Sequence, residues 1–197
     1  MSEGKRLALI LLAVSVIAAA AGATVAWWRA ASAETAGPPA SAAALFALTL
    51  PDADGRPQAL AQWRGKVLVV NFWATWCAPC VEEMPDLNRV RQAYAARGVE
   101  VIGLALDQPD KVREFRDQHG LALPLLVAGM AGSDIARQLG NPAGILPYTV
   151  LVSPTGEVTQ RRLGQIRPAE LRRWLDAQLQ AQRVSPTAEA ASKGLGP

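Results

Sequence analysis

The central part of the chain alternates between continuous apolar runs and apolar positions at helical spacing. Two runs, at residues 66–74 and 99–106, are too short to be helices and predict buried strands. Between them, at 79–98, apolar residues recur every three or four positions, and Gly98 is a good C-cap residue for a helix. Strand, helix and strand in this order predict a right-handed parallel crossover unit.

Weaker patterns on both sides of this unit complete a domain. Before it, two short strands flank an Asp54–Gly55 turn. After it come a helix at 109–120, a short apolar piece, a short helix and two strands joined by a turn at 154–156. A last helix begins at Pro168. We therefore expect the α/β class, as a sandwich with a mixed central β-sheet flanked by helices and an N-terminal β-hairpin extension.

The longest apolar block lies at residues 7–28 and contains no charge. As a helix it would span about 33 Å, enough for the hydrocarbon core of a bilayer. A cleaved signal peptide is the alternative, because a small-x-small site ends at Ala33. The block is longer than the apolar region of a signal peptide and ends in two tryptophans, which are typical of a membrane interface, so we favour a retained anchor.

Charge and composition predict the rest of the organisation. Lys5 and Arg6 precede the block, so the positive-inside rule places the N-terminus in the cytoplasm and the remainder across the membrane. We predict a cytoplasmic N-terminus (1–6), a transmembrane signal-anchor helix (7–28), a flexible tether (29–44), one folded domain (45–183) and a disordered tail (184–197).

The net charge of +3 gives no support for nucleic-acid binding. Residues 1–33 account for two of these charges, through Lys5, Arg6 and Arg29 against Glu3, and +1 remains for the rest. The densest basic run, at 161–173, is interpreted as a solvated hairpin edge and helix face. We therefore expect no nucleic-acid partner.

The only two cysteines, Cys77 and Cys80, lie at the predicted strand-to-helix turn. A structural staple is a weak explanation, because closing so short a loop removes little entropy from the unfolded chain. A zinc site would need four ligands, and His119 is the only histidine. The redox explanation fits the placement: the helix N-terminus stabilises a thiolate at Cys77, and Cys80, one turn further in, can attack a mixed disulfide there.

These residues also carry a family resemblance. WATWCAPC resembles the active-site segment of thioredoxin-fold proteins, and VLVVNFWATWCAPCVEEMP with GILPYTVLVSPTGEV resembles the TlpA/ResA branch of thiol-disulfide oxidoreductases, over about residues 45–182. The resemblance implies a thioredoxin-like sandwich. It also implies a single-pass protein of the bacterial inner membrane with its catalytic domain in the periplasm or on the extracytoplasmic face. It further implies a cis peptide bond at Pro147, facing the cysteines, with the backbone of Leu146 pairing with bound substrate.

The resemblance draws attention to side chains around the cysteines. Glu83 matches the acidic residue of this branch, whereas Asn71 stands where thioredoxins have a buried aspartate. We hypothesise that Glu83 influences the thiol pKa values or serves as base for Cys80. The alternative is a solvated surface acid, which we expect for Glu82. Trp76 is predicted to shield the thiols and to dock substrate, with a pure packing role as the alternative.

The direction of electron flow is predicted from the residues between the cysteines. Ala78 and Pro79 stand there, without the histidine that favours strong oxidants and isomerases, so we expect a protein-disulfide reductase. The branch implies that its clients are disulfides of exported proteins, as in cytochrome c or respiratory copper-site maturation. It also implies that a membrane electron-relay protein is the reductant. We expect no cofactor and no bound metal. An exported dithiol oxidant that donates disulfides is the alternative.

Two further classes fit the sequence less well. A peroxidase of the peroxiredoxin kind would need a PxxxTxxC pattern, and this chain has Val70 and Ala74 at the proline and threonine positions. A copper-binding assembly module would need a histidine in the loop near Pro147, whereas His119 lies in a predicted solvated helix. We keep this module as the less favoured alternative.

Overall fold

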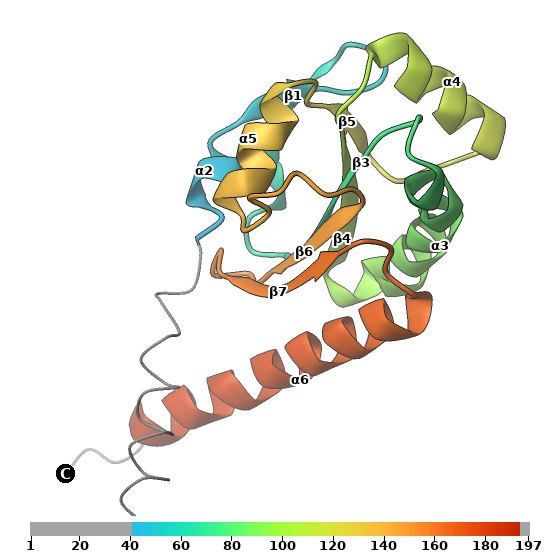
Figure 1. Ribbon diagram of the computed structural model, residues 1–197. Coiled ribbons are helices and arrows are strands. Elements are labelled where there is room, and N and C mark those ends of the chain that lie inside the picture. Colours follow the sequence, from blue (N-terminus) through green and yellow to red (C-terminus); the bar gives the residue numbers. More distant parts are fainter. Residues whose placement is uncertain (1–40, 194–197) are drawn as a thin grey trace, which may run out of the picture. The chain divides into compact units, whose positions relative to one another are not determined.

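The computed structural model describes residues 41–193 (Figure 1). The predicted cytoplasmic segment 1–6 and anchor 7–28 lie outside the described residues, as does most of the predicted tether. Within 41–193, no helix is both long enough and apolar enough to cross a membrane.

Within the described residues, a five-stranded mixed sheet forms the centre of the fold, in the order β5-β4-β3-β6-β7. The strands β3, β4 and β5 are parallel, and β6 and β7 are antiparallel to their neighbours. Their bounds are β3 (Val67–Trp73), β4 (Val99–Ala105), β5 (Leu125–Val127), β6 (Tyr148–Val152) and β7 (Val158–Leu163). Every residue of β3 and β4 is buried, as the two apolar runs predict. The predicted mixed sheet is confirmed.

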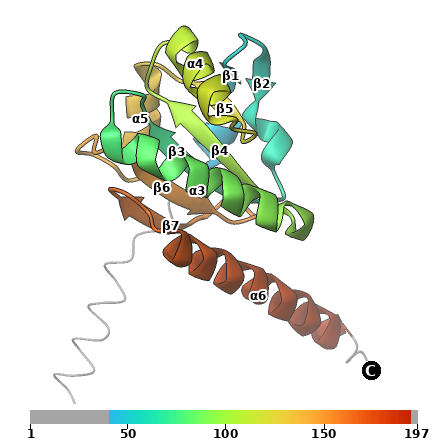
Figure 2. The same cartoon turned by 90° about the vertical axis from the view of Figure 1, so that its right-hand side faces the viewer.

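Helices cover both faces of this sheet. One hydrophobic cluster lies under α3 (Ala78–Tyr94), α4 (Pro109–His119) and α6 (Pro168–Lys193). The other lies under α2 (Ala43–Phe46), the 3-10 helix η1 (Leu60–Trp63) and α5 (Ala131–Gln138). Figure 2 looks onto α3, with the sheet behind it. The predicted sandwich is therefore confirmed.

The crossover between β3 and β4 follows the helical spacing of the sequence. After α3 the chain continues as the 3-10 helix η2 (Ala95–Arg97) and turns at Gly98, whose φ of 79° is left-handed and suits a residue without a Cβ. The buried face of α3 includes Met84, Leu87, Val90 and Tyr94, the four positions that the spacing indicates.

The predicted N-terminal hairpin is present as β1 (Thr49–Pro51) and β2 (Pro57–Ala59), which pair in antiparallel fashion. Asp52, next to β1, also makes an isolated bridge to Leu126 of β5. The hairpin thus lies along the β5 edge of the sheet and covers unpaired backbone groups there.

Two predicted boundaries differ from the structure. The predicted tether includes residues 41–44, but Ala42 is buried and its N–H donates to Gly156 O at 2.8 Å. Leu45 and Phe46, the apolar residues that follow in α2, are buried in the core. The last helix continues to residue 193 instead of ending before a disordered tail at 184. The alanines in this stretch have high helix propensity. Residues 194–197 lie outside the described part.

Candidate active site

The two cysteines lie at the junction of β3 and α3, as predicted. They form a disulfide with an S–S distance of 2.10 Å and a Cα–Cα distance of 5.2 Å. Cys77 is the N-cap residue of α3, and Cys80 lies in its first turn. Cys77 is 7% exposed and Cys80 is completely buried, so Cys77 is the sulfur that an approaching thiol reaches first. Their roles as nucleophile and resolving thiol stay predictions.

Asp107 fixes the turn that leads into Cys77. It follows β4, and its Oδ2 accepts hydrogen bonds from the backbone N–H of Thr75 at 2.9 Å and from the Thr75 hydroxyl at 2.6 Å. Burial alone would raise the pKa of Asp107, but hydrogen bonds from Thr75 and Gln108 outweigh it and lower the pKa. Sequence reasoning missed Asp107. The available signal was an acid directly after a strand that runs parallel to the one before the cysteines.

The residues on either side of Cys77 are open to solvent. Trp76 is 69% exposed, so the pure packing role is wrong, while shielding and substrate docking stay predictions. Ala78 and Pro79 are also exposed, and Pro79 lies in the first helical turn, where its missing N–H costs no hydrogen bond.

The loop before β6 reaches the same end of the sheet. The peptide bond between Leu146 and Pro147 is cis, as predicted. Tyr148 pairs with Phe72, which places Pro147 beside the end of β3 and so near the cysteines. Asn141, a residue that sequence reasoning missed, closes the loop: its Nδ2 donates to Ile145 O at 2.8 Å, and its Oδ1 accepts from Ile145 N at 3.1 Å. The pairing of Leu146 with substrate stays a prediction.

Glu83 is a buried acid, only 1% exposed, so the surface-acid alternative is wrong. Its Oε1 accepts a hydrogen bond from Asn71 Nδ2 at 2.7 Å, and its Oε2 accepts one from Ile166 N at 2.8 Å. Burial raises the pKa of Glu83 from 4.5 to about 7, although both hydrogen bonds favour the charged form. Its neighbour Glu82 is exposed, as expected. Glu83 therefore changes its charge near neutral pH.

Asn71 connects this acid to the neighbouring strand β6. Its Nδ2 also donates to Thr149 Oγ1 at 3.0 Å, and all three side chains are buried. Cys80 and Glu83 lie three positions apart on α3, so their side chains share one face of the helix. The site therefore places a titratable group and a buried polar network directly behind the disulfide.

The comparisons with known proteins agree with this geometry. The sequence matches the AhpC/TSA family over residues 41–161, more than half of the chain. The chain belongs to the AhpC/TSA family.

Relatives that this chain matches are named as thiol-disulfide oxidoreductases. The thiol-disulfide oxidoreductase ResA of Geobacillus kaustophilus (strain HTA426) is 34% identical over 140 residues, which cover 70% of this chain and 76% of the relative. The ResA of Geobacillus thermodenitrificans (strain NG80-2) is 32% identical over 131 residues, which cover 65% of this chain and 72% of the relative. A thiol:disulfide interchange protein of the thioredoxin family from Chlorobium tepidum TLS superimposes with a TM-score of 0.62 at 28% identity. The match covers 73% of this chain and 98% of that one. The resemblance and the thioredoxin-like fold are confirmed.

Two other predictions concern residues that the structure describes. His119 is exposed on α4, where its ring stacks on Phe115 with 4.1 Å between centroids. Among the described residues, no group of three or more His, Cys, Asp or Glu side chains could hold a metal ion. The arginines of the basic run are exposed on β7, on α6 and on the segment between them, which confirms the solvated hairpin edge and helix face: Arg161, Arg162, Arg167, Arg172 and Arg173.

Proposed function

We propose that this thiol-disulfide oxidoreductase works as a reductase of protein disulfides, through Cys77 and Cys80. The observation that carries the proposal is the Cys77–Cys80 disulfide at the N-terminus of α3, where Cys77 is 7% exposed, Cys80 is completely buried, and Glu83 lies three positions after Cys80 on the same helix. The helix terminus favours a thiolate at Cys77, because unpaired N–H groups and the helix dipole stabilise negative charge there. The pair can thus serve as a nucleophile and a resolving thiol.

The exchange proceeds in two balanced steps. The Cys77 thiolate attacks one sulfur of the client disulfide, so a mixed disulfide forms and the other client sulfur leaves as a thiolate that takes up a proton. Cys80 then loses its proton, and its thiolate attacks the Cys77 sulfur. The Cys77–Cys80 disulfide forms, and the second client sulfur leaves with the electron pair and is protonated. Two electrons have moved from the Cys77–Cys80 pair to the client, whose two sulfurs have taken up two protons; the release of one proton by Cys80 balances one of them, and solvent supplies the other.

Glu83 is the proposed acceptor for the proton of Cys80. It lies on the same face of α3, and its pKa of about 7 lets it bind and release a proton at neutral pH. Among the described residues, no other acid is buried behind the cysteines. Asp107, the carboxylate at the turn before Cys77, has a lowered pKa, and its Oδ2 accepts a hydrogen bond from the Thr75 hydroxyl.

The setting of the reaction is part of the proposal. The ResA name of the relatives and the Ala78–Pro79 pair support a reductant rather than an oxidant. We propose clients among exported proteins, in cytochrome c or respiratory copper-site maturation, and a membrane electron-relay protein as the source of electrons. Residues 7–28 are the proposed anchor in the bacterial inner membrane, with the domain on its extracytoplasmic side.

The proposal is tested with the full chain in its reduced form and insulin as the disulfide substrate. Cys80→Ser is expected to accumulate a mixed disulfide through Cys77, because the resolving thiol is gone. The matched variant Cys77→Ser is expected to form none, and both variants should lose turnover. Turnover by Cys77→Ser at the rate of the unmodified protein would refute the assignment.

The same preparation decides the direction of electron flow. The fraction of oxidised Cys77–Cys80 is read by alkylation after equilibration in dithiol redox buffers. We expect a potential near the roughly −270 mV of thioredoxin, as a reductase requires. A value near the roughly −120 mV of the strongest exported oxidant would make the protein a disulfide donor instead.

A further inference from the structure

The buried network contains one polar atom without a partner. Asn71 is completely buried in β3, between Glu83 and Thr149. Its amide nitrogen donates to both neighbours, whereas its amide oxygen, Oδ1, has no hydrogen-bond partner among the described residues. A buried acceptor without a donor is unfavourable and rare in folded proteins. The present orientation of Asn71 therefore provides partners for the amide nitrogen but none for the amide oxygen.

This orientation fits Glu83 in its charged form. Both carboxylate oxygens face donors, since Oε1 meets Asn71 Nδ2 and Oε2 meets the backbone N–H of Ile166. Protonated Glu83 gains an O–H donor, and neither present partner can accept from it, because Asn71 Nδ2 and Ile166 N are both donors. The O–H group is therefore left without an acceptor among these partners, unless one of them changes.

Asn71 is the partner that can change. A side-chain amide carries donors on one arm and an acceptor on the other, at nearly the same reach. A half-turn of the amide places Oδ1 where Nδ2 now lies, 2.7 Å from Glu83 Oε1 and 3.0 Å from Thr149 Oγ1. There it accepts a hydrogen bond from protonated Glu83 and another from the Thr149 hydroxyl, which can donate as well as accept. The backbone of Ile166 cannot make such a change.

We propose that Asn71 is a positioning residue whose amide turns over when Glu83 takes up a proton, so that each protonation state of Glu83 has a matched hydrogen-bond partner. This inference rests on the proposed function, in which Glu83 accepts the proton of Cys80. The turnover gives protonated Glu83 an acceptor and moves Nδ2 to the position that Oδ1 holds without a partner in the charged form. In either form, one arm of the amide is matched to Glu83. Glu83 can therefore both take and release the proton within one reaction cycle.

The surroundings of Glu83 keep this exchange local. Among the described residues, burial and the hydrogen bonds from Ile166 and Asn71 are the causes of its pKa shift, and no neighbouring charge contributes. On α3 the facing titratable group is Cys80, which does not titrate in the disulfide. β3 contributes the Asn71 amide and β6 contributes the Thr149 hydroxyl, and neither group titrates. Arg167, after the Ile166 contact, is exposed.

The test is a titration of the oxidised full chain by NMR between pH 5 and pH 9. The Glu83 carboxyl carbon is expected to titrate near 7, and the Asn71 side-chain amide signals should shift with the same midpoint. The coupling across the hydrogen bond from Asn71 Nδ2 to the Glu83 carboxylate should be present above the midpoint and absent below it. Asn141 is the internal control, because both arms of its amide bind Ile145 and hold it fixed.

Variants give a second readout. In Glu83→Gln the Asn71 signals should stop titrating in this range. Asn71→Leu removes the partner of both protonation states, so the Glu83 midpoint should rise by less than about one pH unit. If the Asn71 amide only donated to charged Glu83 and never turned, Asn71→Leu would instead raise the Glu83 midpoint by about one to two pH units. That result would refute the proposed turnover.

The two proposals fail in different experiments. A hydrogen-bond coupling that persists through the whole titration refutes the turnover of Asn71, while trapping through Cys77 still supports the reductase. A failure of Cys80→Ser to trap the mixed disulfide refutes the proposed reaction, whatever the amide does.

Discussion

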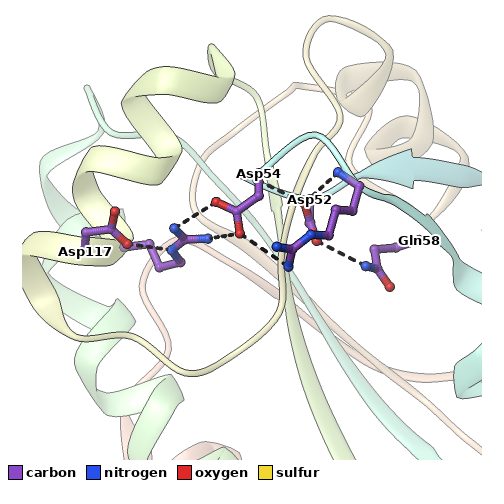
Figure 3. A network of polar contacts seen from close by, with 6 residues as sticks. Asp52, Asp54, Gln58 and Asp117 are labelled. Carbon is purple, nitrogen blue, oxygen red and sulfur yellow. Dashed lines mark hydrogen bonds and ion pairs between the residues drawn. The ribbon is translucent and has the colours of Figure 1, made fainter.

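Glu83 and Asp54 each accept two hydrogen bonds, but one lies in the core behind the disulfide and the other on the surface beside α4. Neutral donors, an amide side chain and a backbone N–H, bind Glu83. The guanidinium of Arg116 binds Asp54 with both terminal nitrogens, at 2.8 and 3.0 Å (Figure 3). Burial raises the pKa of Glu83 to about 7, whereas the hydrogen bond from Arg116 lowers the pKa of Asp54.

The difference shows that the number of hydrogen bonds does not decide the charge state of a carboxylate. In the core, loss of hydration raises the pKa of Glu83 by more than its two neutral donors lower it. On the surface, the hydrogen bond from the Arg116 cation lowers the pKa of Asp54 and favours its ionised form. In the same surface network, burial alone would raise the pKa of Asp52, but hydrogen bonds from the Arg56 and Asp54 amides lower it. The surface network stays charged and ties the hairpin to α4, while the buried one can exchange a proton beside the cysteines.

The largest expected effect is on the pH dependence of stability. The folded pKa of Glu83, about 7, lies above its ordinary value of 4.5, so its contribution to stability is complete below pH 4.5 and is lost as the pH rises through 7. Through Glu83, the oxidised protein should be about 2 to 3 kcal/mol less stable at pH 8 than at pH 5. Glu83→Gln should remove this loss.

Urea unfolding at pH 5 and pH 8 measures the effect. Glu82→Gln is the matched control, because Glu82 is exposed on the same helix and its variant should keep the pH dependence of the unmodified protein. An unchanged pH dependence in Glu83→Gln would mean that Glu83 does not carry a raised pKa, and the contrast with Asp54 would disappear.

An intermediate effect is expected for Asp107, which is only partly buried and holds Thr75. Its lowered pKa means that it stabilises the fold above its ordinary pKa of 3.8 and loses this contribution as the pH falls through the folded value. Asp107→Asn keeps one acceptor but removes the charge, so we expect a loss of about 1 kcal/mol at pH 7, reduced by solvent screening. Thermal unfolding at pH 7 and pH 3 measures this loss, which should be smaller at pH 3 because pH 3 lies below the ordinary pKa of 3.8. An equal loss at both values would assign it to packing.

The contrast also explains what the sequence could predict. β3, β4 and α3 were predicted well because each has a local pattern that burial enforces, and the cysteines follow from their place between two of these elements. The burial of Glu83 depends on Ile166, 83 positions later, and the contact of Asn71 with Thr149 spans 78 positions. No local pattern contains such contacts.

One signal for Glu83 was nevertheless present in the sequence. It lies four positions before Leu87 and seven before Val90, on the apolar stripe of α3. A charged residue on such a stripe indicates a buried acid with partners. Asp107 and Asn141 gave a weaker signal, because polar residues after strands and in loops are common whether or not they hold a functional turn.

The smallest effect is expected in the surface network. Arg116→Met keeps the apolar stem of the side chain but removes its hydrogen bonds to Asp54 and Asp117. Because these groups are exposed or nearly so, the melting temperature should fall by less than about 4 °C, and the difference should shrink further at high salt. Arg89→Met, which removes an exposed pair with Asp86 within α3, is the control for an ion pair that joins no separate elements. A fall in melting temperature for Arg116→Met well beyond that range, and insensitive to salt, would show that the hairpin network behaves like the buried one and that exposure is not the deciding difference.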